Sequence, residues 1–185
     1  SSKPANNQIV LDILGRQKYP ELKVIFTYGF VNRTDPNYLL REGEQFVLIV
    51  NIENVGRVYA KYVNIILEIP QYLCHRGYID NFDIPVFEKN YVKYARFIRE
   101  NVITESKSLD EQIIGRNPGR FDPILPGRNQ GFAIPLADDF ERHSVYFVRN
   151  NPEIHWSLFA DNMPKLSEKI SMNAIKIDQT LPFSK

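Results

Sequence analysis

The sequence predicts an all-β fold, an antiparallel β-sandwich of seven to nine strands with an irregular insertion. Apolar side chains recur at every second position in several short segments, and this period places them on one face of a strand. Turn-forming residues such as Gly, Pro, Asn and Asp separate these segments. The chain also contains 12 Phe, 10 Tyr and one Trp, and aromatic residues favour strands.

The length of 185 residues indicates one large domain with a substantial hydrophobic core. Residues 1–20 are predicted to form a linker or a short helical lead-in from something upstream. Residues 21–178 are assigned to the β-sandwich domain, with the irregular insertion at about residues 71–120. Residues 179–185 are assigned to a C-terminal tail.

The stretch of residues 45–70 is central to this prediction, because it holds two strand patterns on either side of a polar turn. The apolar faces of these strands consist of Phe46, Leu48, Val50 and Ile52, and of Val63, Ile65, Leu67 and Ile69. Both faces must be covered, so we expect the strands to lie in opposite sheets; a hairpin between them is the alternative. The intervening turn, Asn54-Val55-Gly56-Arg57, tolerates a positive φ at Gly56.

Further strands are predicted on both sides of this stretch. Residues 22–30 alternate clearly and form the first strand, and residues 84–87 are interpreted as a short edge strand around Pro85. Residues 91–100 fit a helix and a strand about equally. The strand is favoured because the segment is rich in Tyr and Val and its surroundings are all-β. Residues 106–112 are polar and could hold a short turn or helix.

Alternating patterns return in the last third of the chain. Strands are predicted over residues 132–136, 145–148 and 154–160. Trp156 shares a face with Ile154 and Leu158, which predicts a place in the core. Residues 166–177 are expected to form the last strand, with a bulge near Ala174 where the apolar phase slips. The number and spacing of the strands favour a sandwich of immunoglobulin-like type.

Composition limits the cellular locations and the classes of partner that we expect for this protein. The formal net charge is +1, so nucleic acid binding through this domain is not expected. No apolar run approaches about 18 residues, so no membrane span is expected. Cys74 is the single cysteine, which excludes an internal disulfide. A reducing compartment, the cytoplasm, is the simpler interpretation, and the cell surface is the alternative.

The sequence offers no recognisable catalytic or metal-binding constellation. His75, His143 and His155 do not stand at metal-ligand spacing from one another or from a cysteine. Cys74 and His75 are adjacent, and neighbours on a strand point to opposite faces, so neither a shared metal nor a Cys–His nucleophile is expected. No Gly-rich phosphate loop and no G-x-S-x-G motif is present. We therefore predict no catalytic residue, no metal and no cofactor.

Two groups of residues are candidates for binding. Arg116, Arg120 and Arg128 fall in one stretch rich in Pro and Gly and could converge on an anion or an acidic partner. Such short charge runs are more often a solvated loop. Tyr72 and Tyr78 belong to an aromatic cluster that could stack on sugars or fill a partner's pocket. The more frequent role of such aromatics is to pack an insertion against the sandwich.

Two turn motifs carry a resemblance to known domains. Asn54-Val55-Gly56 follows a strand, and Leu125-Pro126-Gly127 precedes one. In this the chain resembles the immunoglobulin-like domains of the bacterial cell-adhesion-related group, a resemblance that concerns the fold.

A second resemblance lies in residues 155–164, HWSLFADNMP, and in the entry segment, residues 18–22. These segments are similar to the C-terminal β-domains of some bacterial Schlafen-like, Alba-type proteins, which carry an N-terminal ATP- and DNA-binding domain and are often labelled transcriptional regulators. The resemblance implies that this chain is the C-terminal module and that nucleotide-binding residues lie upstream. It assigns a function to no residue of this sequence.

Together these observations predict a non-catalytic protein-interaction or accessory module, the C-terminal part of a larger bacterial regulatory protein. The expected partner is another protein or a neighbouring domain of the same chain. A carbohydrate-binding or cell-surface adhesion module is the alternative. A hydrolase on a sandwich scaffold ranks last, because the sequence shows no catalytic constellation.

Overall fold

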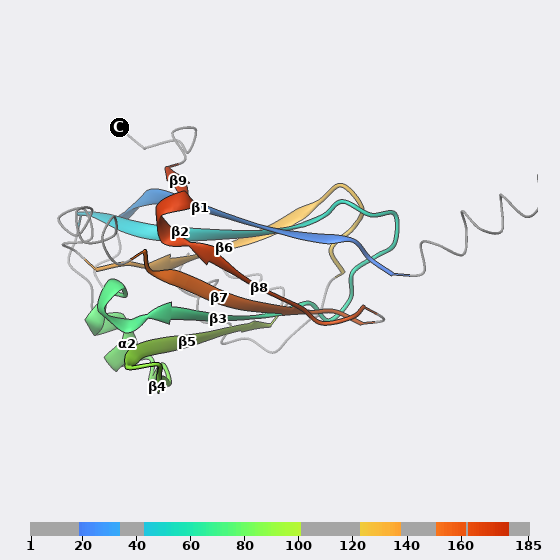
Figure 1. The fold of residues 1–185 in the computed structure, drawn as a ribbon. Helices are drawn as coiled ribbons and strands as arrows, with labels where there is room; N and C mark the ends of the chain where they lie inside the picture. The colour runs from blue at the N-terminus through green and yellow to red at the C-terminus, as the bar shows by residue number, and fades with distance from the viewer. Residues whose placement is uncertain (1–18, 34–42, 101–122, 138–150, 162, 178–185) are drawn as a thin grey trace, which may run out of the picture.

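The computed structural model describes residues 19–33, 43–100, 123–137, 151–161 and 163–177, which form two β-sheets (Figure 1). The strands of the described chain are β1 Leu22–Arg33, β2 Gly43–Asn54, β3 Asn64–Pro70, β4 Val86–Lys89, β5 Val92–Glu100, β6 Asn129–Pro135, β7 Glu153–Phe159, β8 Leu166–Ser171 and β9 Lys176–Ile177. The helical elements are the 3₁₀ helices η1 Gln71–Leu73 and η3 Met172–Ala174 and the α-helix α2 Arg76–Asn81.

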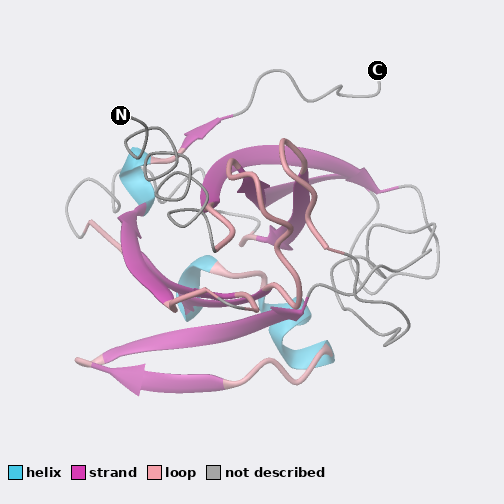
Figure 2. Ribbon diagram, turned by 90° about the vertical axis from the view of Figure 1, so that its right-hand side faces the viewer, coloured by secondary structure: helices cyan, strands magenta, loops and turns pink. Residues whose placement is uncertain are grey.

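The strands form two layers that face each other (Figures 1 and 2). One sheet has four strands in the order β6-β2-β1-β9, and the other has five in the order β4-β5-β3-β7-β8. All named pairs are antiparallel except β1 with β9, which are parallel. The predicted all-β, two-sheet architecture is therefore confirmed. β2 and β3 lie in opposite sheets as expected, and the alternative of a hairpin between them is wrong.

Gly56, in the crossing from β2 to β3, is needed for a reason other than the positive φ that the sequence suggested. Among the described glycines, Gly127 has a positive φ, of 70°, and Gly56 does not. Gly56 is instead required by a close approach, because a Cβ atom there would lie 2.8 Å from the backbone nitrogen of Glu21. The Gly56 N–H also donates to the Glu21 carbonyl at 3.3 Å. The contact fastens the crossing to the start of β1.

The predicted last strand is two strands in different sheets. β8 pairs with β7 in the five-stranded sheet, the chain turns through η3, and β9 pairs with β1 in the four-stranded sheet. The Ser171 side chain accepts the N–H of Asn173 at the start of η3. The Tyr28 hydroxyl donates to the Met172 carbonyl at 2.8 Å and holds the turn to β1. The expected bulge near Ala174 is therefore wrong, because the slip in apolar phase marks a change of sheet.

The region that follows β3 combines confirmed strands with an unexpected helix. The edge strand predicted over residues 84–87 corresponds to β4, and all of the segment 91–100 except Tyr91 forms β5, so the helical alternative for that segment is wrong. Between β3 and β4 the chain forms η1 and α2, which the sequence did not indicate. The predictions for residues 106–112 and 145–148 lie outside the described residues.

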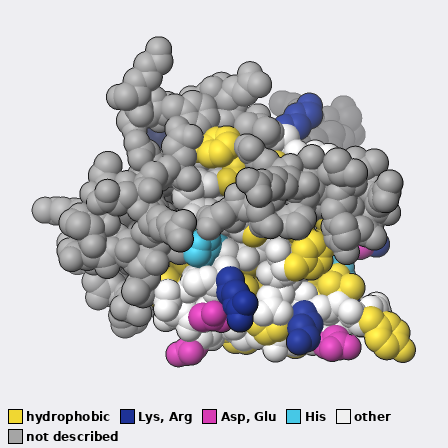
Figure 3. Space-filling model, turned by 90° about the vertical axis from the view of Figure 1, so that its left-hand side faces the viewer, with side chains coloured by type: hydrophobic (Ala, Val, Ile, Leu, Met, Phe, Trp, Pro, Cys, Tyr) yellow, Lys and Arg dark blue, Asp and Glu magenta, His cyan; other side chains and the backbone are white. Residues whose placement is uncertain are grey.

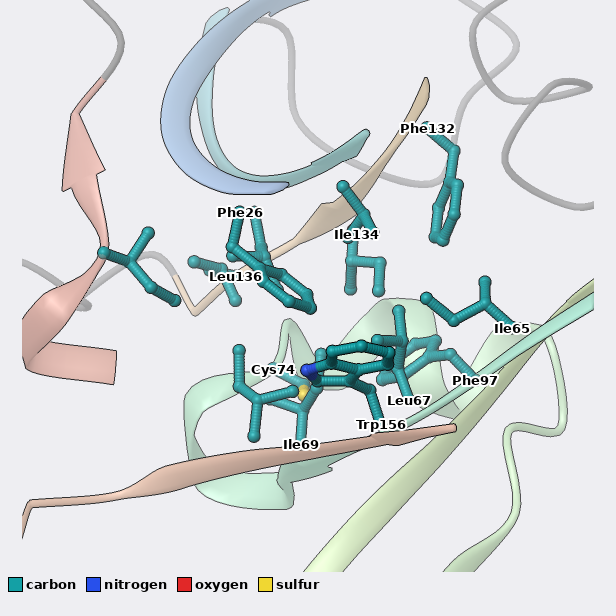
Figure 4. Packing of buried hydrophobic residues seen from close by; sticks show 14 of the residues in the cluster. Phe26, Ile65, Leu67, Ile69, Cys74, Phe97, Phe132, Ile134, Leu136 and Trp156 are labelled. Atoms are coloured by element: carbon teal, nitrogen blue, oxygen red, sulfur yellow. The ribbon is translucent and has the colours of Figure 1, made fainter. Parts of the chain in front are cut away.

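The core lies between the two sheets and confirms the predicted apolar faces. Phe26 from β1 points across the interface at Trp156 from β7, with ring centroids 6.4 Å apart (Figure 4). Trp156 is 8% exposed, as its alternation predicted. Leu48, Ile65 and Leu67 are fully buried between the layers. Each such side chain contributes about 1.5–3 kcal/mol through burial, so the interface between the sheets accounts for a large part of the stability.

Candidate functional site

Of the arginines predicted as a binding group, one is described. Arg116 and Arg120 lie outside the described residues, so their convergence on a ligand stays a prediction. Arg128 is exposed and follows Gly127 in the turn before β6. Its backbone N–H donates to the Leu125 carbonyl at 3.0 Å, and its carbonyl accepts the Asn54 N–H at 3.0 Å. The backbone of Arg128 thus joins the turn to β2, while its side chain faces solvent.

The two predicted tyrosines have different environments. Tyr72 in η1 is 43% exposed and lies at the surface. Tyr78 in α2 is 4% exposed and packs on Phe82 and Phe97, with ring centroids 4.7 and 6.3 Å away. The prediction of Tyr78 as an exposed binding residue is therefore wrong, because its ring packs the helical insertion against the five-stranded sheet. This is the more frequent role of such aromatics.

Cys74 and His75 do not form a nucleophile and base. Cys74 is buried, and burial raises the pKa of its thiol well above its ordinary value. The thiol is within 3.6 Å of the Pro70 carbonyl, to which it donates. His75 caps α2, where its Nδ1 accepts the Tyr78 N–H at 3.2 Å. A thiolate nucleophile needs a lowered pKa and a base beside it, so this pair lacks the arrangement required for nucleophilic catalysis.

A groove of about 910 Å³ lies beside α2, at the end of the molecule that faces the viewer in Figure 3. We call it the α2 groove. Its polar and aromatic lining includes Gln71, Tyr72, Arg76, Asp80, Tyr91 and Lys93. Figure 3 shows basic, acidic and hydrophobic side chains close together on the lower half of this face. The groove therefore offers hydrogen-bonding groups next to aromatic rings.

A second candidate surface is the outer face of the five-stranded sheet, which points away from the four-stranded sheet. The β-sheet register aligns four side chains in one line across β5, β3, β7 and β8, and we call this line the outer row. Its members are Arg96, Glu68, His155 and Lys169. Neighbours directly opposite each other on a sheet face interact, and opposite charges there stabilise the pairing. Along the row the order of groups is therefore a cation, a carboxylate, an imidazole and a second cation.

The carboxylates hold the cations of the outer row in place. Glu68 Oε1 accepts two hydrogen bonds from Arg96, from Nη2 at 2.9 Å and from Nε at 3.3 Å. Glu153, which precedes the row on β7, binds the Lys169 ammonium through Oε1 at 2.9 Å and Oε2 at 3.0 Å. Charge-assisted hydrogen bonds are stronger than neutral ones. The two bonds to Glu68 therefore orient the guanidinium group, whereas the Lys169 pair is largely exposed and constrains its ammonium group less.

His155 lies at the centre of this arrangement. Its Nδ1 is 3.3 Å from Lys89 Nζ and 4.0 Å from Glu68 Oε2, and its Nε2 is 3.9 Å from Glu153 Oε2. Its ring centroid is 5.4 Å from that of Tyr94. Desolvation by burial and then the charge of Lys89 lower the pKa of His155, against the two carboxylates, which raise it. The neutral imidazole can accept a hydrogen bond from the Lys89 ammonium at Nδ1.

The positive groups stand further out than the negative ones. The side chains of Glu68 and Glu153 are 19% and 31% exposed, whereas those of Arg96 and Lys169 are 42% and 65% exposed. A partner that approaches the sheet therefore meets the cations first. The neighbouring line of side chains begins with Ile98, which is 60% exposed, and Ile66, and it continues with Ser157 and Ser167. Exposed apolar side chains next to ordered charges are typical of an interaction surface.

Two kinds of feature, a metal-binding cluster and a membrane-spanning helix, are absent from the described residues. No group of three His, Cys, Asp or Glu side chains in the described ranges is arranged to hold a metal ion. No helix among these residues combines the length and the apolar character needed to cross a membrane.

Comparison with known proteins does not identify a family for this chain. No protein-family model matches the sequence, and a search of curated proteins finds no match. Among solved structures, the chain is similar to a Bordetella pertussis protein described as a "Putative ApaA Protein", at 14% identity and a TM-score of 0.36, over 83% of this chain and 91% of that one. It is also similar to the structural-genomics target SoR45, at 10% identity and a TM-score of 0.36, over 89% of this chain and 92% of that one. Neither likeness bears on the function of this chain.

Proposed function

We propose that this chain is a non-catalytic interaction module that binds an acidic protein surface through the outer face of its five-stranded sheet. The observation that carries the proposal is the outer row, in which exposed cations stand above recessed carboxylates. Lys89, which is also exposed, adds a third cation beside His155. Ordered charges of this kind steer a partner of opposite sign and fix its register.

An acidic protein fits this face better than a nucleic acid does. Glu68 and Glu153 separate the cations from one another, so the face offers isolated positive groups that suit single carboxylates better than a continuous phosphate backbone. The exposed Ile98 favours a partner that can bury apolar surface beside its acidic groups. The formal net charge of +1 provides no general attraction for a polyanion.

We propose further that the sandwich is of immunoglobulin-like type. The order β6-β2-β1 corresponds to strands E, B and A of that fold, and the order β3-β7-β8 corresponds to strands C, F and G. Two features depart from it. The core tryptophan, Trp156, lies on β7 instead of the strand that corresponds to C, and β5 lies between β3 and β4 although it follows β4 in sequence.

The motifs noted in the sequence support a place for this module in a larger bacterial regulatory protein. In that setting the acidic surface would belong to a neighbouring domain or to a separate protein. The single cysteine, held as a free thiol in the core, supports a cytoplasmic location.

The test uses peptides selected from a random displayed library on the immobilised chain. We expect the selected peptides to be rich in Asp and Glu, with an apolar residue nearby. The double variant Lys89→Glu/Lys169→Glu should weaken their binding by about tenfold or more, because it reverses two charges that the partner meets first.

The control variant, Lys23→Glu/Lys61→Glu, changes the net charge equally at two exposed lysines away from the outer row. It should leave the affinity nearly unchanged. Peptides without acidic enrichment, or an equal loss of affinity in both double variants, would contradict the proposal. Selective retention of single-stranded DNA by the wild-type protein would contradict it as well.

A further inference from the structure

Tyr91 is the most exposed large hydrophobic side chain of the described residues, at 99%. It stands with Asn90 in the turn between β4 and β5, and both residues have positive φ angles, 63° and 52°. A two-residue turn with both angles positive favours Asn followed by Gly, because a bulky side chain is disfavoured in the left-handed region. The chain therefore keeps a tyrosine where glycine would suit the backbone better. Such local strain is concentrated at functional sites.

The α2 groove lies directly beside this tyrosine. Tyr72 and Tyr91 both line it, and each presents ring surface to solvent. Gln71 supplies an amide, and Arg76 and Asp80 supply a guanidinium and a carboxylate held 3.7 Å apart on successive turns of α2. An amide, a guanidinium and a carboxylate together can donate to and accept from several hydroxyl groups.

The lining favours one class of ligand over two others. An apolar ligand requires a mostly apolar, enclosing pocket, whereas apolar groups such as Ile79 and Val92 share the lining of this groove with charged and amide groups. An anion requires converging cations; Arg76 and Lys93 line the groove, but Asp80 lies 3.7 Å from Arg76 and offsets part of this positive charge. A sugar ring presents an apolar face of C–H groups that can stack on tyrosine, and hydroxyls at its edge that can bond amides and charged groups. The volume of about 910 Å³ is sufficient for more than one such ring.

We propose that the α2 groove is a carbohydrate-binding site in which Tyr91 and Tyr72 are the stacking platforms. Gln71, Arg76 and Asp80 bind the hydroxyl groups of the sugar. The tyrosine at position 91 is retained at the expense of turn geometry because its ring must project into the groove mouth. The site is separate from the outer row and does not depend on the interaction proposed for that row.

The experiment screens the full chain on an array of immobilised oligosaccharides and then titrates the strongest one, free in solution, by calorimetry. The expected result is binding that Tyr91→Ala and Tyr72→Ala each weaken by about tenfold or more. Tyr59→Ala is the matched control, since Tyr59 is 56% exposed and does not line the groove. It should bind as the wild type does.

Tyr91→Gly separates binding from folding, because glycine suits the backbone at this turn. It should lose binding to the same extent as Tyr91→Ala while remaining folded. Absence of binding to every oligosaccharide on the array would overturn the proposal, and so would unchanged affinity in Tyr91→Gly. Lys169→Glu, which alters the outer row, should leave oligosaccharide affinity unchanged, so the two proposals can fail independently.

Discussion

The side chain of Asn54, at the end of β2, donates a hydrogen bond of 2.8 Å to the carbonyl of Ile124, 70 residues further along the chain. The same amide group donates to the Val58 carbonyl at 2.7 Å, and its oxygen accepts the Gly56 N–H at 3.1 Å. Asn54 is 1% exposed, so these bonds are made out of water. One buried amide thus joins the crossing between the sheets to the segment that leads into β6.

Replacement of this amide should destabilise the protein. Asn54→Ala removes three hydrogen bonds and deprives the Val58 and Ile124 carbonyls of the amide that donates to both, so we expect a loss of about 2 kcal/mol in the free energy of unfolding. Urea denaturation measures it. Asn129→Ala, at an exposed position in β6, is the control and should change stability by less than about 0.5 kcal/mol. Equal stability of the two variants would show that Asn54 does not hold the crossing.

Cys74 should be unreactive in the folded protein. Its thiol is 3% exposed and its pKa is raised by burial, so little thiolate is present at neutral pH. We expect iodoacetamide to alkylate Cys74 slowly in buffer and rapidly in urea, as mass spectrometry can follow. Rapid alkylation of the native protein would indicate an activated thiol and would reopen a catalytic role for the Cys74–His75 pair.

The imidazole of His155 should titrate below its ordinary pKa of 6.5, because burial and Lys89 disfavour the charged form. Lys89→Met should raise this pKa, and Glu153→Gln should lower it further, since the carboxylate favours the charged ring. Nuclear magnetic resonance of the ring protons measures all three values. A pKa that does not change in Lys89→Met would show that the ammonium group is not beside the ring.

The same shift predicts a loss of stability at acid pH. Because the folded state binds the His155 proton more weakly than the unfolded state does, stability is lost as the pH falls below about 6.5, through the lowered folded-state pKa. His155→Gln lacks this contribution. Urea midpoints of the wild type should therefore fall more steeply between pH 7.5 and pH 5.5 than those of His155→Gln. Parallel pH profiles would contradict the lowered pKa.

Replacement of Tyr91 by glycine should make the protein more stable and should weaken oligosaccharide binding. Tyr91→Gly removes a bulky side chain from a left-handed backbone position, which should stabilise the protein by about 1 kcal/mol. Thermal or urea unfolding measures the gain, and Tyr59→Ala, which relieves no such conformation, is the control. A loss of stability in Tyr91→Gly would show that the ring contributes to packing and is not kept for a ligand.

The sequence predicted the parts of the fold that local periodicity encodes. The apolar faces of β2 and β3, and their separation into opposite sheets, followed from alternation and from the need to cover both faces. The change of sheet at η3 gave the same signal as a bulge, because both interrupt the apolar phase. Helix α2 is six residues long, too short to show a helical period, so the burial of Tyr78 could not be read from its surroundings.

The outer row could not be predicted, although each of its members is visible in the sequence. Glu68 and Arg96 are 28 residues apart, and they meet because β3 and β5 pair in one particular register. That register depends on packing between distant strands, and a shift by one residue would reverse the faces. The signal that could have been used is the polar residue at alternate positions, Glu68 on β3 and His155 on β7, which marks one exposed sheet face.

The most direct test of the interaction proposed for this chain is to map where an acidic peptide from the displayed library binds. Backbone amide resonances of the ¹⁵N-labelled chain should shift on titration at Glu68, Arg96, His155 and Lys169, and the shifts should diminish as salt is added. Shifts confined to the four-stranded sheet, or to the α2 groove, would contradict the proposal that the outer row receives the partner.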